Sequence, residues 1–496
     1  MFSEKWTRLS GPTALDTMAR IGAEGFPGHV DTVVVAAADG YWDALAASPL
    51  AGAKGAPVLL TATDGLSERT ASEIDRLGAT KAYICGGEFS VSNTVKQQLE
   101  AKGLTVTRLA GAGAAATAVA IANELGDAAP KSCIIATAGT FQDALAASPY
   151  AYWSKTPVFL ANGQTGLLDE ETVAAVKQAG FTSAVIAGGE YWISEDVRGQ
   201  LASAGVPSEA IERRSGATAY ETSASLAAWS LGQGMTVDGM AVATGETYYD
   251  ALTGAALCGK LGSVLVLASE GNTSVIDDIV ADHAKIIRHG YIFGGPFSVA
   301  QSVQGLLEQT IAGRWFTVTL VKADGTRVEK NYSKAEFEAL KSDSTTPQSG
   351  MYYKSSVWNV TTAASYVTLK DLFSNAGVSD SWSPGATLSY EGRGGKDQSY
   401  TYDQVMTGKF FPNAEADVSD ATGAVDVVPC LMLTDSSSIV KTTAADAQAA
   451  NVAAASSEGA PMMLFGVDAD DFAAKNSSGM RYWRGLRTIT IVAPRA

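Results

Sequence analysis

At 496 residues the chain is too long for a single hydrophobic core, and a prior of about 150 residues per domain predicts three or four domains. Hydrophobic residues make up 46% of it and charged residues only 18%, which excludes a largely disordered chain. The net charge of −16 and the pI of about 4.7 argue against a nucleic-acid partner, because a phosphate backbone requires a surface rich in Lys and Arg.

Neither the start of the chain nor its cysteines fix a compartment. The opening MFSEKWTRLSG lacks the charged-then-apolar pattern of a signal peptide, so the chain is either cytosolic or a mature form with Met1 added. No apolar run reaches the roughly 18 residues that span a bilayer, so we expect no membrane span. The four Cys show no CxxC spacing, and we interpret them as small buried hydrophobes: Cys85, Cys133, Cys258 and Cys430.

One stretch of sequence occurs three times, and the rest of the first 310 residues is organised around it. The copies are ADGYWDALAASPLAGAKGAPVLL at 38–60, AGTFQDALAASPYAYWSKTPVFL at 138–160 and the more divergent GETYYDALTGAALCGKLGSVLVL at 245–267. Each copy predicts a loop, a helix that starts at an Asp (Asp43, Asp143 and Asp250), and a buried strand.

Two further motifs recur with it in a constant order, which is strong evidence for tandem repeats. The first is Arg-x-x-Gly followed by Thr: Arg8, Gly11 and Thr17; Arg108, Gly111 and Thr117; Arg213, Gly216 and Thr222. The second is a Gly-Gly pair after a strand: Gly86 and Gly87; Gly188 and Gly189; Gly294 and Gly295. We therefore predict three modules, 1–104, 105–209 and 210–313, followed by a separate domain, 314–496.

Within each module, strands alternate with helices. In the second module we expect the strands LTVTRL, SCIIAT, PVFLA and SAVIAGG, with helices that begin near Thr117, Asp143 and Asp169. Such alternation predicts a parallel sheet with right-handed crossovers, so each module is expected to be a small α/β domain.

The three motifs together resemble the cell wall binding repeat 2 (CWB2) family of Gram-positive surface proteins, over residues 5 to about 312. The third module departs from the pattern, because Ser48-Pro49 and Ser148-Pro149 become Ala255-Ala256. The resemblance implies Toprim-like or Rossmann-like modules around a pseudo-threefold axis. It also implies a secreted protein that is held non-covalently on an anionic cell-wall polysaccharide.

All three motifs follow strands, and ligands of open parallel sheets bind at the carboxyl ends of strands. The candidate ligand-binding residues are the repeated Arg for anionic groups, the Gly for close backbone approach, the repeated Asp, and the aromatic residues before each Asp for stacking on sugars. These aromatic residues are Tyr41, Trp42, Phe141, Tyr248 and Tyr249. Structural roles compete with this hypothesis: the Asp as helix N-caps, the Arg as partners of a carboxylate or a neighbouring module, and the aromatic residues as part of the core.

The sequence gives little support for nucleotide binding, because GAGAAATAVA lacks G-x-G-x-x-G spacing and no GxxxxGK[ST] motif occurs. We expect no cofactor and no metal. A cytosolic nucleotide-binding protein nevertheless remains as an alternative.

After Arg314 the apolar residues alternate with a period of two, and ADGT predicts the turn of a hairpin within 315–333. The next predicted element is a helix, SKAEFEALKS, with a capping box at Ser333 and Glu336. It is followed by a strand, TLSYEGRGGKDQSYTY, a polar and Ala-rich region at 434–460, and a closing strand, RTITIVAP. This is expected to be an α+β domain. Some segments faintly resemble the sulfite-oxidase type molybdopterin domain. In that family a Cys ligates the metal from a loop, whereas Cys430 lies within a strand-like run and the cofactor contacts have no counterpart, so we expect a scaffold without the metal site.

Two functions remain open for this last domain. It is either an adhesion or ligand-binding unit for an extracellular ligand, or a hydrolase of wall glycan or peptide. Candidate glycan-contacting rings are Trp358, Trp382, Tyr400, Tyr402 and Trp483. Candidate catalytic carboxylates, which no motif distinguishes, are Glu391, Asp397, Asp403 and Asp435.

Overall fold

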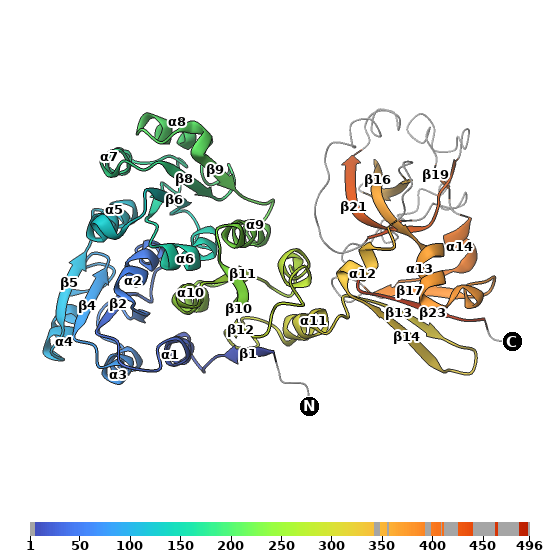
Figure 1. Cartoon of the computed structure of the whole chain (residues 1–496), viewed down its shortest axis with the longest axis horizontal. Coiled ribbons are helices and arrows are strands. Elements are labelled where there is room, and N and C mark those ends of the chain that lie inside the picture. Colours follow the sequence, from blue (N-terminus) through green and yellow to red (C-terminus); the bar gives the residue numbers. More distant parts are fainter. Residues whose placement is uncertain are drawn as a thin grey trace. The chain divides into compact units, whose positions relative to one another are not determined.

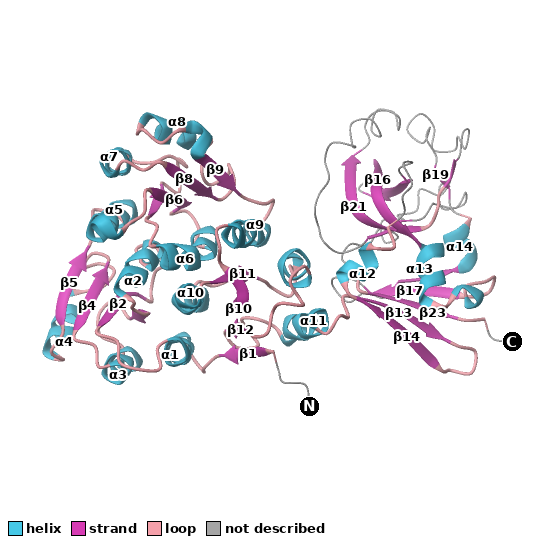
Figure 2. Cartoon of the chain, in the orientation of Figure 1, coloured by secondary structure: helices cyan, strands magenta, loops and turns pink. Residues whose placement is uncertain are grey.

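The computed structural model describes residues 5–341, 348–354, 357–391, 398–407, 409–410, 425–439, 462–464 and 486–494. The chain divides into two compact units, Met1–Glu308 and Gln309–Ala496. The first unit alternates helices and strands, whereas strands predominate in the second (Figure 2).

Three four-stranded parallel sheets form the first unit, as the alternation predicted (Figure 1). The first sheet has the order β3 (Val58–Thr61), β2 (Thr32–Ala37), β4 (Lys81–Cys85), β5 (Thr105–Leu109). The second has the order β7 (Val158–Ala161), β6 (Ser132–Thr137), β8 (Ser183–Ala187), β9 (Ile211–Arg214). The third has the order β11 (Ser263–Leu267), β10 (Thr236–Ala243), β12 (Gly290–Phe293), β1 (Trp6–Leu9).

The sheets are one strand out of step with the sequence repeat. LTVTRL, which was expected in the second module, is β5 and pairs with β4 of the first sheet. In the same way β9 completes the second sheet, and the first strand of the chain, β1, completes the third by pairing with β12. Each strand that carries the repeated Arg therefore belongs to the sheet of the preceding repeat, and the three repeats close into a ring.

Helices join and cover these sheets. Their bounds are α1 (Ala14–Gly25), η1 (Ala44–Ala46), α2 (Ser48–Lys54), α3 (Glu68–Leu77), α4 (Asn93–Ala101), α5 (Ala114–Leu125), η2 (Gly126–Ala128), α6 (Gln142–Ser154), α7 (Glu170–Ala179), α8 (Asp196–Ser203), η3 (Ser208–Ala210), α9 (Ala219–Gly232), α10 (Tyr249–Leu261), the π-helical turn η4 (Ile276–Ala281) and α11 (Gln301–Ile311). The helices α2, α6 and α10, which lie within the thrice-repeated stretch, pack against one another in the middle of the unit (Figure 1).

Small residues allow this close central packing. A Cβ at Gly52 would collide with the backbone of Tyr152, and a Cβ at Gly259 would lie 2.5 Å from the Cβ of Tyr152. Buried residues from one face of each sheet and from the central helices form one hydrophobic core around a pseudo-threefold axis, whereas Ile135 and Phe159 of the second sheet belong to a separate cluster. The Ala-rich DALAASP sequence is therefore explained by helix packing at that axis.

The second unit contains two larger sheets. The first has the order β14 (Arg327–Tyr332), β13 (Phe316–Val321), β23 (Thr488–Val492), β17 (Thr387–Glu391), β18 (Gln398–Thr401). The second has the order β15 (Gln348–Lys354), β16 (Val357–Thr368), β21 (Cys430–Ile439), β22 (Met462–Leu464). The remaining elements are α12 (Lys334–Glu338), α13 (Leu369–Ala376), η5 (Ser379–Ser381), α14 (Tyr402–Met406), and a pair of short strands, β19 (Lys409–Phe410) and β20 (Val425–Asp426).

Several local expectations for this unit are confirmed. The strands β13 and β14 form the antiparallel hairpin, Ser333 and Glu336 form the capping box at α12, and β23 is the closing strand. The single strand expected for TLSYEGRGGKDQSYTY is wrong, because this segment contributes two antiparallel strands, β17 and β18. Most of the Ala-rich 434–460 region lies outside the described residues.

Candidate functional site

Each Gly-Gly loop is held by the Arg of another repeat. The Nη1 atom of Arg108 donates to the carbonyl oxygen of Gly86 at 2.8 Å. Arg213 makes the same bond to Gly188, and Arg8 makes it to Gly294, each at 2.8 Å. The ring of repeats thus creates three equivalent sites, in which the Gly-Gly pair comes from one repeat and the Arg from the next.

The other donors of these guanidinium groups are also used within the protein. Arg108 donates to the carbonyl oxygens of Val91 and Ser92, and Arg8 to the side chain of Gln304. Arg213 forms an ion pair with Glu195 at 3.0 Å. Burial lowers the pKa of Arg8 and Arg108, but guanidinium groups start so far above neutrality that they remain charged. In this structure, therefore, the repeated Arg hold loops in place.

The repeated Asp lie on the other side of each Gly-Gly loop. A Cβ at Gly86, Gly188 or Gly294 would come within 3.0 Å of the carboxylate of Asp43, Asp143 or Asp250 respectively. These three glycines also have φ values of +119°, +130° and +99°, which L side chains rarely adopt. The first Gly of each pair is therefore required both by its backbone conformation and by the neighbouring carboxylate.

The alternative that these Asp cap helices is wrong. Asp143 and Asp250 lie inside the first turns of α6 and α10, where Phe141 and Tyr248 hold the N-cap positions, and the side chain of Asp43 makes no capping hydrogen bond. The carboxylates instead turn toward the Gly-Gly loops, where the hydroxyl of Ser90 donates to Asp43.

Burial raises the pKa of Asp143 to about 7 and that of Asp250 to about 6. A hydrogen bond from Ser298 partly offsets this effect at Asp250. In the second module Trp192 occupies the place of Ser90 and Ser298, so Asp143 has no such donor. The second site is consequently the one in which the carboxylate is least stabilised as an anion.

The Gly and Thr of the Arg-x-x-Gly…Thr motif form the crossing from one sheet to the next module. The backbone N–H groups of Gly11, Gly111 and Gly216 donate to Thr17, Thr117 and Thr222 at 3.1, 3.2 and 3.0 Å. A Cβ at any of these glycines would collide with the first turn of the following helix. This part of the motif therefore has a structural role at all three crossings.

Three predicted aromatic residues meet at the pseudo-threefold axis. The ring centroid of Tyr41 lies 5.3 Å from that of Phe141 and 5.4 Å from that of Tyr248, while Phe141 and Tyr248 are 5.8 Å apart. Trp42 stacks on Tyr41 and is 50% exposed, and Tyr249 packs beside Tyr248. The sequence-predicted aromatic residues thus form one central cluster that is partly packed on the core.

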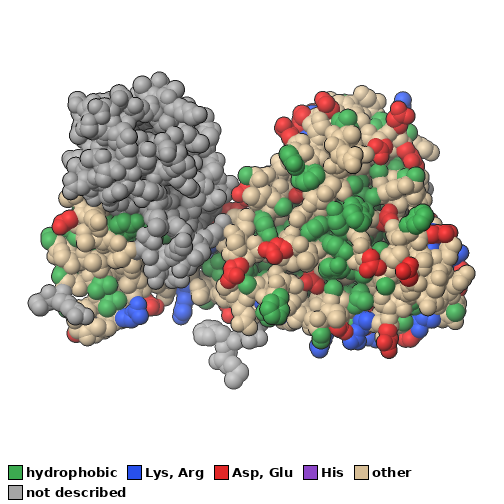
Figure 3. Space-filling view, turned by 180° about the vertical axis from the view of Figure 1, so that it is seen from behind, with side chains coloured by type: hydrophobic (Ala, Val, Ile, Leu, Met, Phe, Trp, Pro, Cys, Tyr) green, Lys and Arg blue, Asp and Glu red, His purple; other side chains and the backbone are tan. Residues whose placement is uncertain are grey.

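Three further aromatic residues were not singled out from the sequence. Phe89, Tyr191 and Phe297 follow the Gly-Gly pairs at equivalent positions, and their side chains are 88% to 105% exposed. The signal was present in GGEF, GGEY and GGPF, where an aromatic residue recurs although its neighbours vary. Hydrophobic side chains also gather on the face of the repeat unit seen in Figure 3, with Asp and Glu between them.

The second Gly of each pair has open space around it. A Cβ at Gly87, Gly189 or Gly295 would meet no atom within 4 Å. None of the three has a positive φ. Unlike the first Gly, the second is not required by packing or by backbone conformation.

Comparison with known proteins decides the family. The model of cell wall binding domain 2 (CWB2) matches residues 8–96, 108–198 and 213–304, which is more than half of the chain. The chain belongs to the CWB2 family. Cell wall binding is therefore the role of its three repeats, and the protein is associated with the cell wall or cell surface.

Two curated relatives from Bacillus subtilis (strain 168) are each 27% identical to 62% of this chain. They are N-acetylmuramoyl-L-alanine amidase LytC, over 306 residues, and an amidase enhancer, over 310 residues. The chain spans only 58% and 40% of the lengths of these two proteins.

Two solved CWB2-related structures from Clostridium difficile resemble the chain, each with a TM-score of 0.56. Cwp8 is 25% identical, with 62% of this chain and 52% of Cwp8 covered. Cwp6 is 19% identical, with 71% and 66% covered, so that this likeness concerns the fold alone.

Within the described part of the chain, no helix combines the length and apolar character that crossing a membrane requires. All four Cys are free and buried, as expected from their apolar surroundings. Cys430 lies in β21, where burial raises the pKa of its thiol.

Of the five candidate glycan-contacting rings of the second unit, the structure describes the side chains of Trp382, Tyr400 and Tyr402. Tyr400 is buried, and Trp382 packs between Phe373 and Tyr402. The side chains of Trp358 and Trp483 lie outside the described residues, as do those of Glu391, Asp397 and Asp435.

Proposed function

We propose that the three CWB2 repeats hold this protein non-covalently on an anionic secondary polymer of a Gram-positive cell wall, and that the C-terminal unit is displayed as an adhesion or ligand-binding domain. The observation that carries this proposal is the threefold recurrence of one loop arrangement at the carboxyl ends of the sheets. A polymer of repeating units suits a surface that repeats the same contacts three times.

The proposed contact surface consists of the Gly-Gly loops and the rings around them. Because the second Gly of each loop is open to solvent and unnecessary for folding, we assign it to close approach by the polymer backbone. Pyranose rings carry C–H groups that pack on the electron-rich faces of aromatic rings, so Phe89, Tyr191, Phe297 and Trp42 provide suitable contacts.

Acidic groups of the polymer would meet helix N-termini rather than the repeated Arg. The helices α6 and α10 begin beside these loops, and the first N–H groups of a helix attract anions. Arg8, Arg108 and Arg213 act in this proposal by fixing the loops, since their donors are already bonded to protein oxygens.

The experiment compares sedimentation of the full chain, residues 1–313 and residues 314–496 with Gram-positive cell walls. The cut is placed after Gly313 because the boundary between the units falls inside α11. We expect the full chain and 1–313 to sediment with intact walls and to stay in solution after chemical removal of the anionic secondary polymer. Sedimentation of 314–496 alone, or equal binding to stripped walls, contradicts the proposal.

The alternative is a wall hydrolase that the repeats direct to its substrate. It is favoured by the similarity to LytC, which is named as an N-acetylmuramoyl-L-alanine amidase. Among the described residues, however, no three His, Cys, Asp or Glu side chains form a metal-binding group. Release of soluble fragments from purified walls by the full chain would favour this alternative over a binding unit.

A further inference from the structure

The threefold pattern is broken at one place in the second sheet. In the first sheet the hydroxyl of Tyr83 donates to Glu124 at 3.0 Å, and in the third the hydroxyl of Tyr291 donates to Glu24 at 2.8 Å. These Tyr precede the first Gly of the Gly-Gly pair by three residues, and these Glu follow the Gly of Arg-x-x-Gly by thirteen. The same positions in the second sheet hold Val185 and Trp229, which cannot form this bond.

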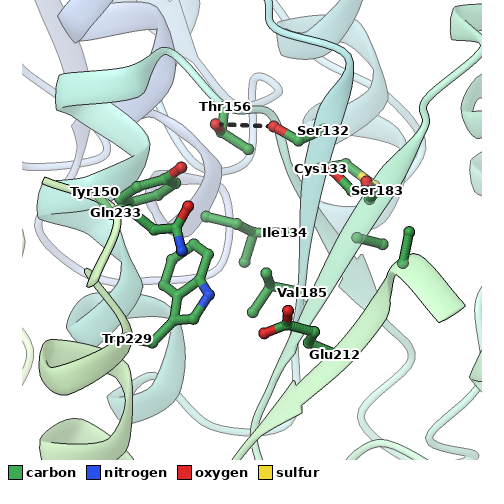
Figure 4. Close-up of a pocket in the computed structure, with 12 residues that line it drawn as sticks. Ser132, Cys133, Ile134, Tyr150, Thr156, Ser183, Val185, Glu212, Trp229 and Gln233 are labelled. Carbon is green, nitrogen blue, oxygen red and sulfur yellow. Dashed lines mark hydrogen bonds between the residues drawn. The ribbon is translucent and has the colours of Figure 1, made fainter. Parts of the chain in front are cut away.

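A pocket of about 250 Å³ lies where this bond is missing. Figure 4 shows Tyr150, Gln233 and Trp229 on one side of it and Ser132, Ser183, Val185 and Glu212 on the other. In the first sheet Lys54 further fills the corresponding region, because it pairs with Glu124 at 3.0 Å and lies over the ring of Tyr83. The two substitutions thus coincide with this pocket, and the second module also has Ser154 at the position of Lys54.

This pocket is separate from the Gly-Gly loops. Ser132 and Ser183 begin the strands β6 and β8, whereas Gly188 follows the end of β8. The pocket therefore lies at the amino ends of the strands, at the opposite edge of the sheet from the proposed polymer contact. A ligand here would leave the Gly-Gly loop unobstructed.

The lining identifies the chemical class of ligand. No Lys, Arg or His lines the pocket, and Glu212 contributes a carboxylate, so that a phosphate or carboxylate ligand would be repelled. Hydroxyl groups of Ser132 and Ser183, the Gln233 amide and the Glu212 carboxylate can donate or accept hydrogen bonds. The rings of Tyr150 and Trp229, 4.5 Å apart, supply an apolar wall.

We propose that this pocket binds one uncharged pyranose unit, either a free sugar or the end of a glycan chain. A pocket below the roughly 300 Å³ typical of drug-sized ligands suits a single sugar ring. The hydroxyl groups of such a sugar match the polar lining of the pocket, and the C–H face of the sugar ring matches the indole of Trp229. This site does not depend on the proposed function of the Gly-Gly loops.

The test uses the full chain and two probes, glucose and N-acetylglucosamine, with saturation-transfer NMR and calorimetry. The decisive variant is the double substitution Val185→Tyr and Trp229→Glu, which restores the Tyr–Glu pair of the other two sheets and fills the pocket. We expect saturable binding of at least one sugar to the native chain, and a loss of at least ten-fold in affinity in this variant at unchanged melting temperature.

Tyr83→Phe is the matched control, because it removes the corresponding hydrogen bond in the first sheet and should leave sugar binding unchanged. If the double variant unfolds, Gln233→Ala tests the same pocket from its exposed edge and should weaken binding. A short N-acetylglucosamine oligomer distinguishes the two sources: tighter binding than the monosaccharide indicates a chain end. Absence of saturable binding by both sugars, or full affinity in a folded double variant, overturns the proposal.

Discussion

At the scale of single residues, the buried carboxylate of Asp143 links stability to pH. Its folded-state pKa of about 7 lies above the ordinary value of 3.8 for an Asp, so near neutral pH the folded chain binds a proton that the unfolded chain does not. This contribution is fully present below the unfolded pKa and is lost as the pH rises through 7. When the pH falls from 8 to 5, we expect protonation of Asp143 to raise the free energy of unfolding by roughly 2 kcal/mol.

Asp143→Asn checks this prediction, since the amide keeps the shape without the charge. Chemical denaturation at pH 5 and pH 8 should show a smaller pH dependence in this variant, with its largest gain in stability at pH 8. Asp169→Asn, at the N-cap of α7 where its side chain makes no capping bond, is the control. An unchanged pH profile in Asp143→Asn contradicts the assignment.

The exposed rings provide a second prediction. Phe89→Ala, Tyr191→Ala and Phe297→Ala, combined in one chain, should reduce wall binding at least ten-fold. Because fully exposed rings add little to folding, the melting temperature should change by less than about 2 °C. Ile286→Ala removes a side chain that is 58% exposed and serves as the control in the sedimentation assay. Native binding by the triple variant would exclude these rings from the contact surface.

At the scale of elements, the Arg strands act as braces for the Gly-Gly loops. Arg108→Ala removes charge-assisted bonds to the carbonyls of Gly86 and Val91, at 2.8 and 2.7 Å. We expect a loss of about 2 kcal/mol in unfolding free energy together with weaker wall binding. Arg69→Ala, which removes a half-exposed ion pair with Asp16, should cost less than about 1 kcal/mol. Lost binding at unchanged stability in Arg108→Ala would instead make this Arg a direct ligand contact.

The first strand carries another prediction. Trp6 is 1% exposed, and its ring occupies the space that a side chain at Gly290 would need. Trp6→Ala should therefore lower the stability of the repeat unit by about 3–5 kcal/mol, as measured by denaturant unfolding. A matched truncation, Trp153→Ala, removes an indole that is 40% exposed and should cost much less.

The strands and the order of motifs could be predicted from the sequence because apolar runs and turns are local signals. Sheet membership could not be, since β5 is equally apolar whether it pairs with β4 or with β6. Long-range packing decides it: the chain crosses to the next module only after Leu109, at the Gly111 and Thr117 contact. The N-cap prediction for Asp143 failed for a related reason. The carboxylate of Asp143 lies beside Gly188, which is 45 residues further along the chain, and local sequence does not reveal this contact.

At the scale of the whole molecule, the sequence predicted the edge of each sheet at which the candidate site lies, but not the contacts that form the site. The three motifs were expected at the carboxyl ends of the strands, and they do meet there. The sequence offered a neighbouring module as one partner of the repeated Arg, but it did not reveal that the partner is the carbonyl oxygen of the Gly-Gly loop at all three sites. The pocket beside Trp229 was also beyond sequence patterns, because it depends on which residues of α9 and β8 face each other across the modules.

The pairing of Trp6 with Gly290 joins two residues 284 positions apart, and this has a consequence for how the protein folds. A growing chain releases its first strand long before the edge of β12 exists to receive it. Closing so long a loop is entropically costly and typically slow, so the final sheet should mature last. Until then β1 and β12 are unpaired edges, and at high concentration one chain can donate its first strand to another. Dilute refolding should thus yield closed monomers, and concentrated refolding exchanged assemblies.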